Sequence, residues 1–303
     1  MKFSVWPLFS RPWDEVVSFA RAVEAQGWHG LWYADHYMAD HPADEPTDSP
    51  ALECWEVLAG LAAATERLRL GTLVSPTTVH HPALLAKRAA TLDRMSHGRF
   101  VLGLGAGWQV NEHRAYGIDL RSPKDRVDRF EEAIEIVSLL LTQQRTSFDG
   151  RHFTITDAPC EPKPVQSPLP ILVGTAGRRM SRIAARFAHE WNVWGTPERV
   201  TALGQVIDAA CTAEGRDPAT LRRSAQALIM FDDGSDAMAR MRDKADPERT
   251  IFGTSEQIAE RIRAYQPLGI EEFIVPDFTL GATAQARIEG FSRFWTEVVP
   301  LAA

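Results

Sequence analysis

Short apolar segments alternate with longer segments of helical periodicity along almost the entire chain. Residues 3–6 are typical of a buried strand, and residues 13–26 follow with Phe19 and Val23 on one helical face. The pattern then repeats to give about eight strand–helix units. Further strands are predicted at residues 30–34, 68–74, 100–104, 171–173, 192–194, 224–230 and 272–275, and further helices at 51–64, 82–95, 125–141, 178–188, 197–214, 256–268 and 284–299.

Residues 145–170 interrupt this alternation. Residues 146–156 alternate between polar and apolar types and contain Asp149-Gly150, a dipeptide typical of hairpin turns. Residues 159–170 hold five of the 19 prolines, which excludes a regular helix or central strand. We interpret both stretches as one excursion from a single domain, not as a domain boundary.

The predicted strands are short and apolar throughout, as expected when both faces of a parallel sheet are buried. Such an alternation fits either a (β/α)₈ TIM barrel or a doubly wound sheet. No Gly-x-Gly-x-x-Gly opening is present, which favours the barrel. We therefore predict one α/β TIM-barrel domain over residues 1–303.

The sequence marks the starts of two helices: Thr196 precedes Pro197, and a capping box runs from Thr254 to Gln257.

Composition narrows the possible partners and compartment. The 303 residues are 45% hydrophobic and carry a net charge of −7, which favours solubility over nucleic-acid or anionic-membrane binding. Cys54, Cys160 and Cys211 are far apart, which argues against a disulfide framework and predicts the cytoplasm. Residues 1–7 have the character of a strand rather than a signal peptide, and no apolar run approaches the ~20 residues of a membrane span.

In a TIM barrel, catalytic groups gather where strands end and the following loops begin. After the strand at 171–173 come Gly174, Thr175, Ala176, Gly177 and Arg178, where a helix starts. Free N–H groups at a helix N-terminus attract anions, and glycine lets a phosphate approach the backbone. This segment is a candidate phosphate cradle. The alternative is an ordinary turn whose glycines serve geometry alone.

Asp35 and His36 follow the strand at 30–34 and form a candidate acid–base pair, because histidine exchanges protons near neutral pH. The alternative is a loop pair that binds backbone or water. The chain has no HExxH motif and no other recognisable metal spacing, so we predict no metal site.

A glycine-rich run, residues 103–108, ends the strand at 100–104. It lacks the third spaced glycine of a dinucleotide-binding loop, and we expect Gly105 and Gly107 to clear space beside a flat ring. Trp6 and Trp108 lie at strand ends and are candidates for lining a mouth that holds an aromatic cofactor.

Several motifs occur together and in order along nearly the whole chain: residues 30–36, 70–76, 81–82, 92–100, 103–108, 148–153, 162–166, 170–174 and 252–259. In these motifs the chain resembles the luciferase-like monooxygenase superfamily, and within it the branch that depends on coenzyme F420. The resemblance implies a TIM barrel with insertions, a cofactor ring across its mouth, and a homodimer.

The resemblance also implies roles for particular residues. A non-prolyl cis peptide at about Leu73-Val74 would support the ring, and the cofactor phosphate would bind at residues 174–178. His36 would be the acid–base residue, with Asp35 orienting it or the cofactor, and Asn111 would contact the cofactor. Trp108 departs from those dehydrogenases that carry a glutamate after the glycine, which weakens the case for a sugar-phosphate substrate.

The function implied is hydride transfer between coenzyme F420 and a small organic substrate that the sequence does not identify. One alternative is a reduced-FMN monooxygenase of the same superfamily, which would need a partner reductase. The other is a non-catalytic flavin-binding barrel.

Overall fold

The computed structural model describes residues 1–302, and eight parallel strands close into a barrel in it. Neighbouring strands pair in parallel around the circle, and the β3–β5 and β13–β1 pairs complete it. The predicted TIM barrel is therefore confirmed. The barrel strands are β1 (Lys2–Trp6), β2 (Gly30–Tyr33), β3 (Arg69–Thr72), β5 (Phe100–Gly105), β8 (Ile171–Gly174), β9 (Glu190–Trp194), β10 (Arg222–Gln226) and β13 (Glu272–Pro276).

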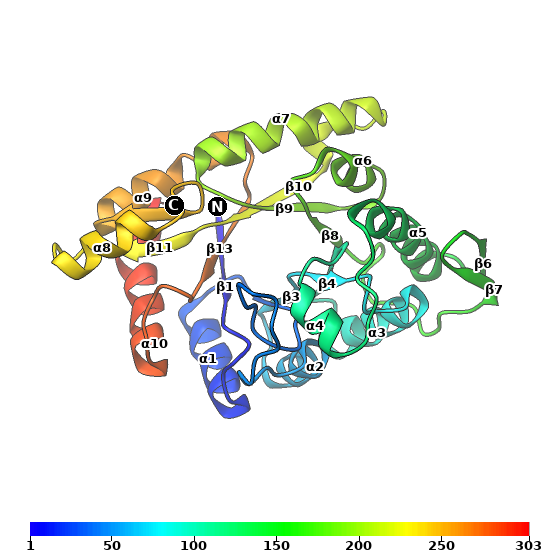
Figure 1. Ribbon diagram of the computed structural model, residues 1–303, viewed down its shortest axis with the longest axis horizontal. Helices are drawn as coiled ribbons and strands as arrows, with labels where there is room; N and C mark the ends of the chain where they lie inside the picture. The colour runs from blue at the N-terminus through cyan, green and yellow to red at the C-terminus, as the bar shows by residue number, and fades with distance from the viewer. Residues whose placement is uncertain (303) are drawn as a thin grey trace.

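Helices surround the barrel, as Figure 1 shows. The bounds of α1 and α3 coincide with the predicted ones, because Gly27 directly follows the end of α1 and Pro82 is the first residue of α3. The covering helices are α1 (Trp13–Gln26), α2 (Cys54–Ala64), α3 (Pro82–Met95), α5 (Pro123–Thr142), α6 (Arg178–Phe187), α7 (Pro197–Ala213), α9 (Ser255–Arg263) and α10 (Ala284–Arg293), with a π-helix over Phe294–Val298 and α11 (Val299–Ala302) after it.

Three predictions of local structure need correction. The strand predicted at 224–230 is two strands, because β11 (Leu228–Phe231) leaves the barrel and pairs with β12 (Thr250–Gly253). Thr196 is the N-cap of α7, but its hydroxyl makes no bond to the helix backbone. The helix predicted at 256–268 ends at Arg263, and a 3₁₀ turn over Gln266–Leu268 follows it. No prediction was made for α4 (Val110–Ala115), α8 (Asp236–Lys244), β12 and a 3₁₀ turn at Pro218–Thr220. By contrast, the capping box from Thr254 to Gln257 is confirmed.

The excursion at residues 145–170 is an antiparallel hairpin, β6 (Thr146–Asp149) and β7 (Thr154–Ala158), outside the barrel sheet. Figure 1 places it on the side of the molecule opposite α8. Glu132 of α5 holds its turn by accepting three backbone N–H groups, from residues 151 to 153. Asp93 of α3 is fully buried and accepts from the backbone of Val165 and Gln166, so the proline-rich segment is pinned to the barrel wall.

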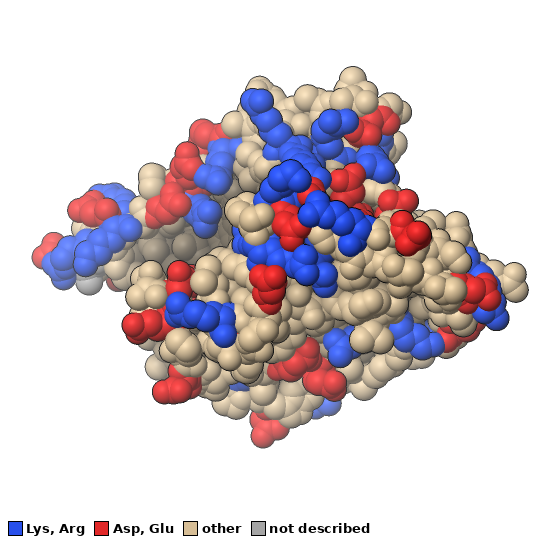
Figure 2. Space-filling view, turned by 45° about the vertical axis from the view of Figure 1, so that its right-hand side comes forward, with Lys and Arg blue, Asp and Glu red and all other residues tan. Residues whose placement is uncertain are grey.

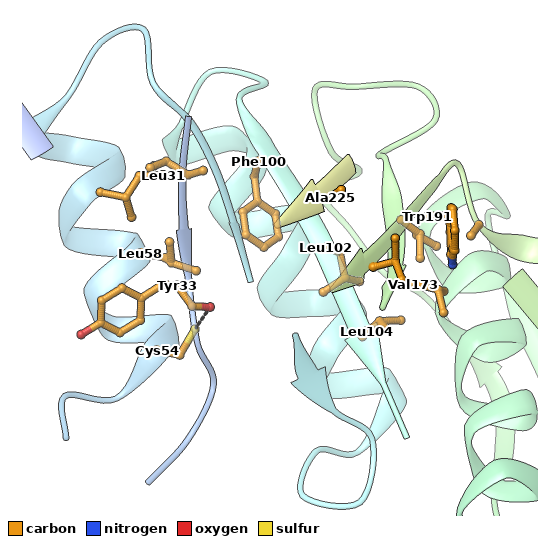
Figure 3. Close-up of a cluster of buried hydrophobic side chains, with 14 of the residues drawn as sticks. Leu31, Tyr33, Cys54, Leu58, Phe100, Leu102, Leu104, Val173, Trp191 and Ala225 are labelled. Carbon is orange, nitrogen blue, oxygen red and sulfur yellow. Dashed lines mark hydrogen bonds between the residues drawn. The ribbon is translucent and has the colours of Figure 1, made fainter. Parts of the chain in front are cut away.

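The larger hydrophobic core lies between the strands and the helices. In Figure 3, Leu31, Phe100 and Leu102 extend from their strands, and Leu58 and Cys54 meet them from α2. Successive residues of a strand point to opposite faces, so the residues between them fill the barrel interior. A second cluster occupies that interior and includes Trp6, Trp32, Val101, Leu172 and Ile274.

The N-terminal end of the barrel is closed by a buried ionic cluster. Arg69 pairs with Glu190 and, at 3.1 Å, with Glu272. The indole of Trp32 donates to Glu272 at 2.7 Å. With this end filled, the C-terminal end is left for a ligand, as in other TIM barrels.

None of the helices in the described part of the chain is both long and apolar enough to cross a bilayer.

Glycines in β5 make room for the neighbouring strand. A Cβ on Gly103 would lie 1.9 Å from the carbonyl oxygen of Thr72, and a Cβ on Gly105 would lie 2.7 Å from Cγ2 of Val74. The expectation that Gly105 clears space beside a ring therefore needs correction, because its neighbour is a side chain of the protein. Gly107 has φ +86°, which favours glycine, and lies against Thr78.

Gly103→Ala should destabilise the protein by at least about 3 kcal/mol, because the added methyl group meets backbone that cannot rotate away. Gly204→Ala in α7 is the matched control. Its Cβ meets nothing closer than 3.9 Å, so helix propensity should stabilise the protein by up to about 1 kcal/mol. Urea unfolding of both variants checks the pair, and a Gly103→Ala protein as stable as wild type would contradict the packing described.

Candidate functional site

A cavity of about 810 Å³ opens at the C-terminal end of the barrel. This volume is in the range of small-molecule and cofactor sites. Segments far apart in sequence converge on it, from the loops after β1, β2, β5, β8 and β13. Ten of the residues singled out from the sequence line it: Trp6, His36, Leu73, Val74, Gly105, Gly107, Trp108, Gly174, Thr175 and Ala176.

Four predicted site residues do not line the cavity: Asp35, Asn111, Gly177 and Arg178. Asn111 is fully buried, and its amide donates to the carbonyl oxygens of Ala39 and Glu45. It therefore ties the loop after β2 to α4. Gly177 and Arg178 are exposed at the start of α6, next to the lining residues 174–176.

One wall of the cavity is formed where β3 breaks. The peptide bond between Leu73 and Val74 is cis, as the family resemblance implied, and β4 (Ser75–Pro76) resumes pairing with β5 beyond it. Val74 packs against Gly105, and its Cγ1 would lie 3.3 Å from a Cβ on Gly174. The wall is thus apolar and tightly supported by two neighbouring strands, which suits the face of a flat ring.

His36 pairs with a carboxylate that the sequence did not identify as its partner. Its Nδ1 lies 3.0 Å from Oε1 of Glu112, and Oε2 of Glu112 accepts from the backbone N–H of Tyr37 at 2.9 Å. A carboxylate only accepts, so Nδ1 donates, and the neutral ring then presents Nε2 as an acceptor. Nε2 has no hydrogen-bond partner within residues 1–302, and His36 borders the cavity.

Glu112 is 1% exposed, and α4 positions it. The side-chain oxygen of Asn111 accepts from the backbone N–H of Glu112 at 2.9 Å and from Gln109 at 2.8 Å. The only signal for Glu112 in the sequence was its place in the loop after β5. Its partner, His36, lies 76 positions earlier, and hydrophobic periodicity does not predict contacts over such a separation.

Asp35 is fully buried, and its hydrogen bonds go to residues other than His36. Its Oδ2 accepts from Ser75 at 2.5 Å, from His80 at 2.9 Å and from Trp55 at 3.1 Å. Burial by itself raises the pKa of this carboxyl, but the hydrogen bond and charge of His80, with the bonds from Ser75 and Trp55, outweigh burial and hold the pKa below its usual value. Asp35 thus anchors β4, directly after the cis peptide, and the suggestion that it orients His36 needs correction.

The start of α6 offers free backbone donors. Gly177 is its N-cap and provides no side chain to accept from the first turn. Arg179 is already paired with Asp128 and Glu131, and Arg186 with Glu131. Figure 2 brings the side of α5 and α6 forward and shows basic and acidic side chains interleaved there. An anion at this helix would therefore be bound by the N–H groups and by Arg178, which is exposed and forms no ion pair within residues 1–302.

Asp125, Asp128 and His152 form another cluster, with ligand-type atoms within 4.8 Å of one another. Lys124 and Arg179 already pair with Asp128, so its charge is neutralised. A metal ion would have to displace these cations, and we assign no metal to the cluster.

The model of the luciferase-like monooxygenase family matches residues 1–247. This chain therefore belongs to the luciferase-like monooxygenase family. An F420-dependent glucose-6-phosphate dehydrogenase of Kineococcus radiotolerans is 29% identical over 223 residues, which are 72% of this chain and 64% of the relative. An F420-dependent hydroxymycolic acid dehydrogenase of Mycobacterium tuberculosis is 30% identical over 231 residues, 76% of this chain and 62% of the relative. The chain thus spans slightly less than two thirds of these relatives.

Solved structures share the fold at lower identity. An F420-dependent secondary alcohol dehydrogenase, in complex with an F420-acetone adduct, superposes with a TM-score of 0.83 at 18% identity, over 100% of this chain and 99% of the other. A monooxygenase from Streptomyces bottropensis superposes with a TM-score of 0.80 at 22% identity, over 100% of both chains. These matches support the barrel and leave the reaction open.

Asp35→Asn should lower the free energy of unfolding by about 2 kcal/mol at neutral pH, because a charged acceptor of three hydrogen bonds is lost. The folded carboxyl has a lowered pKa. Its contribution is therefore full above the unfolded value of ~3.9 and is lost as the pH falls through the folded value. The difference from wild type should shrink in acid, as urea unfolding between pH 3 and 7 would measure.

Asp40→Asn, at an exposed position in the same loop, is the control and should change stability little at any pH. A wild-type advantage over Asp35→Asn that grows as the pH falls would contradict the role assigned to Asp35.

Proposed function

We propose that the protein is an F420-dependent oxidoreductase that acts on a small organic substrate. The observation that carries this proposal is that Nε2 of His36 has no hydrogen-bond partner within residues 1–302. His36 lines a cavity that is also bordered by an apolar wall and lies next to a helix start without a side-chain cap. The names of the relatives at about 30% identity support F420 as the cofactor.

The residues at the cavity fit such a cofactor. Its ring would lie on the apolar wall of Leu73 and Val74, and its phosphate at residues 174–178, where the first turn of α6 has free N–H groups. Trp6 would border the ring. When bound, F420 supplies the hydride chemistry.

The protein supplies acid–base chemistry through His36. Glu112 fixes the ring so that Nδ1 carries a proton and Nε2 can accept one from a substrate hydroxyl. The imidazolium formed then lies against the Glu112 carboxylate, which stabilises its charge. In the reverse direction Nε2 returns the proton. Asp35 keeps β4 in place and takes no part in proton transfer.

A reduced-FMN monooxygenase with a partner reductase would use the same cradle, and a non-catalytic flavin-binding barrel would bind without turnover. Fluorescence titrations with F420 and with FMN separate these possibilities. We expect F420 to bind and to be reduced by an alcohol substrate. Tight FMN binding with no F420 binding would overturn the proposal. We further propose that the protein is cytoplasmic, which fits three buried, unpaired cysteines, and that it forms a homodimer, as the family resemblance implies.

His36→Ala should lower kcat by roughly 10²–10⁴-fold, the usual contribution of a general acid–base residue. F420 affinity should stay within about threefold of wild type, because the imidazole is bound to Glu112 and not to the phosphate cradle. Steady-state reduction of F420 and a fluorescence titration give the two values.

Glu112→Gln is the companion variant. It keeps the shape but not the charge, so turnover should fall, because the carboxylate that orients the imidazole is lost. Full activity of His36→Ala would remove His36 from the mechanism.

Gly177→Asp should lower F420 affinity at least about tenfold, because a carboxylate would cap the free N–H groups and repel a phosphate. The same cap should raise stability slightly, by about 0.3 kcal/mol. A lower F420 affinity in a fluorescence titration together with a higher Tm would distinguish this effect from unfolding. Gly177→Ala, whose Cβ meets no atom within 4 Å, is the control and should keep its affinity. Unchanged affinity of Gly177→Asp would place the phosphate elsewhere.

A further inference from the structure

Two aromatic side chains enclose the imidazole of His36 at the cavity. The ring of Trp108 lies 5.5 Å from it, centroid to centroid, with an interplanar angle of 81°. The ring of Phe9 lies 6.1 Å away and is tilted by 50°. Both residues line the cavity, so a molecule at Nε2 of His36 would lie near apolar rings.

Three more aromatic residues extend this apolar surface. Trp6 ends β1, Trp194 ends β9, and Phe278 follows β13. The ring centroid of Trp6 lies 5.3 Å from that of Trp194 and 5.2 Å from that of Phe278. We call these three residues the aromatic cluster. All of them line the same cavity as His36.

The charged residues of the cavity, apart from the exposed Asp40, already have ionic partners. Arg199 pairs with Glu248, and Arg249 lies 3.5 Å from Asp246. Glu112 is buried against His36. Among the described lining residues, neither arginine is therefore a free cation for a phosphate or carboxylate of a substrate. Desolvating an unpaired anion here would be costly.

Exposed aromatic surface remains at the mouth. Trp108 is 57% exposed and Phe278 is 40% exposed, although both border a concave cavity. Covering such surface removes apolar area from water, and aromatic rings add a preference for other flat rings. The surface therefore favours a ring-bearing occupant over a small aliphatic or a sugar phosphate.

We propose that the substrate is an uncharged alcohol that carries an aromatic or alicyclic ring, and that Trp108 determines this specificity. This inference rests on the proposed function. The ring would lie between Trp108 and the aromatic cluster, with the hydroxyl at Nε2 of His36. In oxidation the hydroxyl proton passes to Nε2, the carbinol hydrogen leaves with its electron pair to F420, and a carbonyl forms. Trp108 thus contacts substrate rather than cofactor.

The test measures binding before turnover. Isothermal titration of the F420-loaded protein with acetophenone, acetone and glucose 6-phosphate should show acetophenone binding at least about tenfold more tightly than acetone, and no binding of glucose 6-phosphate. Turnover should follow the same order, with 1-phenylethanol exceeding 2-propanol in kcat/KM by a similar factor.

Trp108→Ala should reduce the preference for acetophenone about tenfold while F420 affinity and Tm stay near wild type, because this side chain is largely exposed. Trp108→Phe should retain most of the preference. Tyr116→Ala removes another exposed aromatic, just after α4 and outside the cavity lining, and should change nothing.

The outcomes separate the two proposals. A protein that binds no F420 overturns the proposed function and this inference with it. Normal F420 binding with equal affinity for acetone and acetophenone, tighter binding of glucose 6-phosphate, or an unchanged preference in Trp108→Ala overturns the inference alone.

Discussion

The contact between Thr72 and Gly103 is the constraint on which the rest of the site depends. The hydroxyl of Thr72 donates to the carbonyl oxygen of Gly103 at 2.7 Å and accepts from its N–H at 2.9 Å. A side chain thus joins β3 to β5 at the place where the backbone ladder stops. The approach is close enough to exclude any Cβ at Gly103, and it lets the chain turn at Leu73-Val74 while the barrel stays closed.

Two buried carboxylates, Asp35 and Glu112, have different roles because their surroundings differ. Asp35 is sealed from solvent and receives donors from three segments, so its charge is fixed and its role is to hold β4. Glu112 also lies out of solvent but binds an imidazole that reaches the cavity. The His36–Glu112 pair is therefore assembled from the loops after β2 and β5, whereas the support for the apolar wall comes from the end of β2, from α2 and from β4.

Much of the fold could be predicted from the sequence because its signals are local. Helical periodicity and Pro82 set the bounds of α3, and apolar runs gave the barrel strands. The cradle and His36 could be located because both directly follow strands. The mostly apolar segment 224–230 could not reveal that the chain leaves the barrel after Gln226, since β10 and β11 are both partly buried and differ in which strands they pair with.

Partnerships between side chains could not be predicted in the same way. Nothing near Asp35 in sequence indicates that Trp55, Ser75 and His80 converge on one oxygen. Glu112 was missed as the partner of His36 because α4 is only six residues long and too short for periodicity to show. Asn111 was placed at the cofactor by resemblance, but its four hydrogen bonds are all internal.

The ionic cluster of Arg69, Glu190 and Glu272 lies at the opposite end of the barrel from the cavity. The two ends, or rims, of the barrel therefore have separate roles: the ionic cluster closes one rim, and the cavity opens at the other. Within residues 1–302, the ion pairs of Arg69 share no partner with the residues that line the cavity, so substitutions in the two groups should have largely additive effects on stability. Loops at the open rim can then diversify under selection for new substrates while the scaffold beneath them keeps its stability.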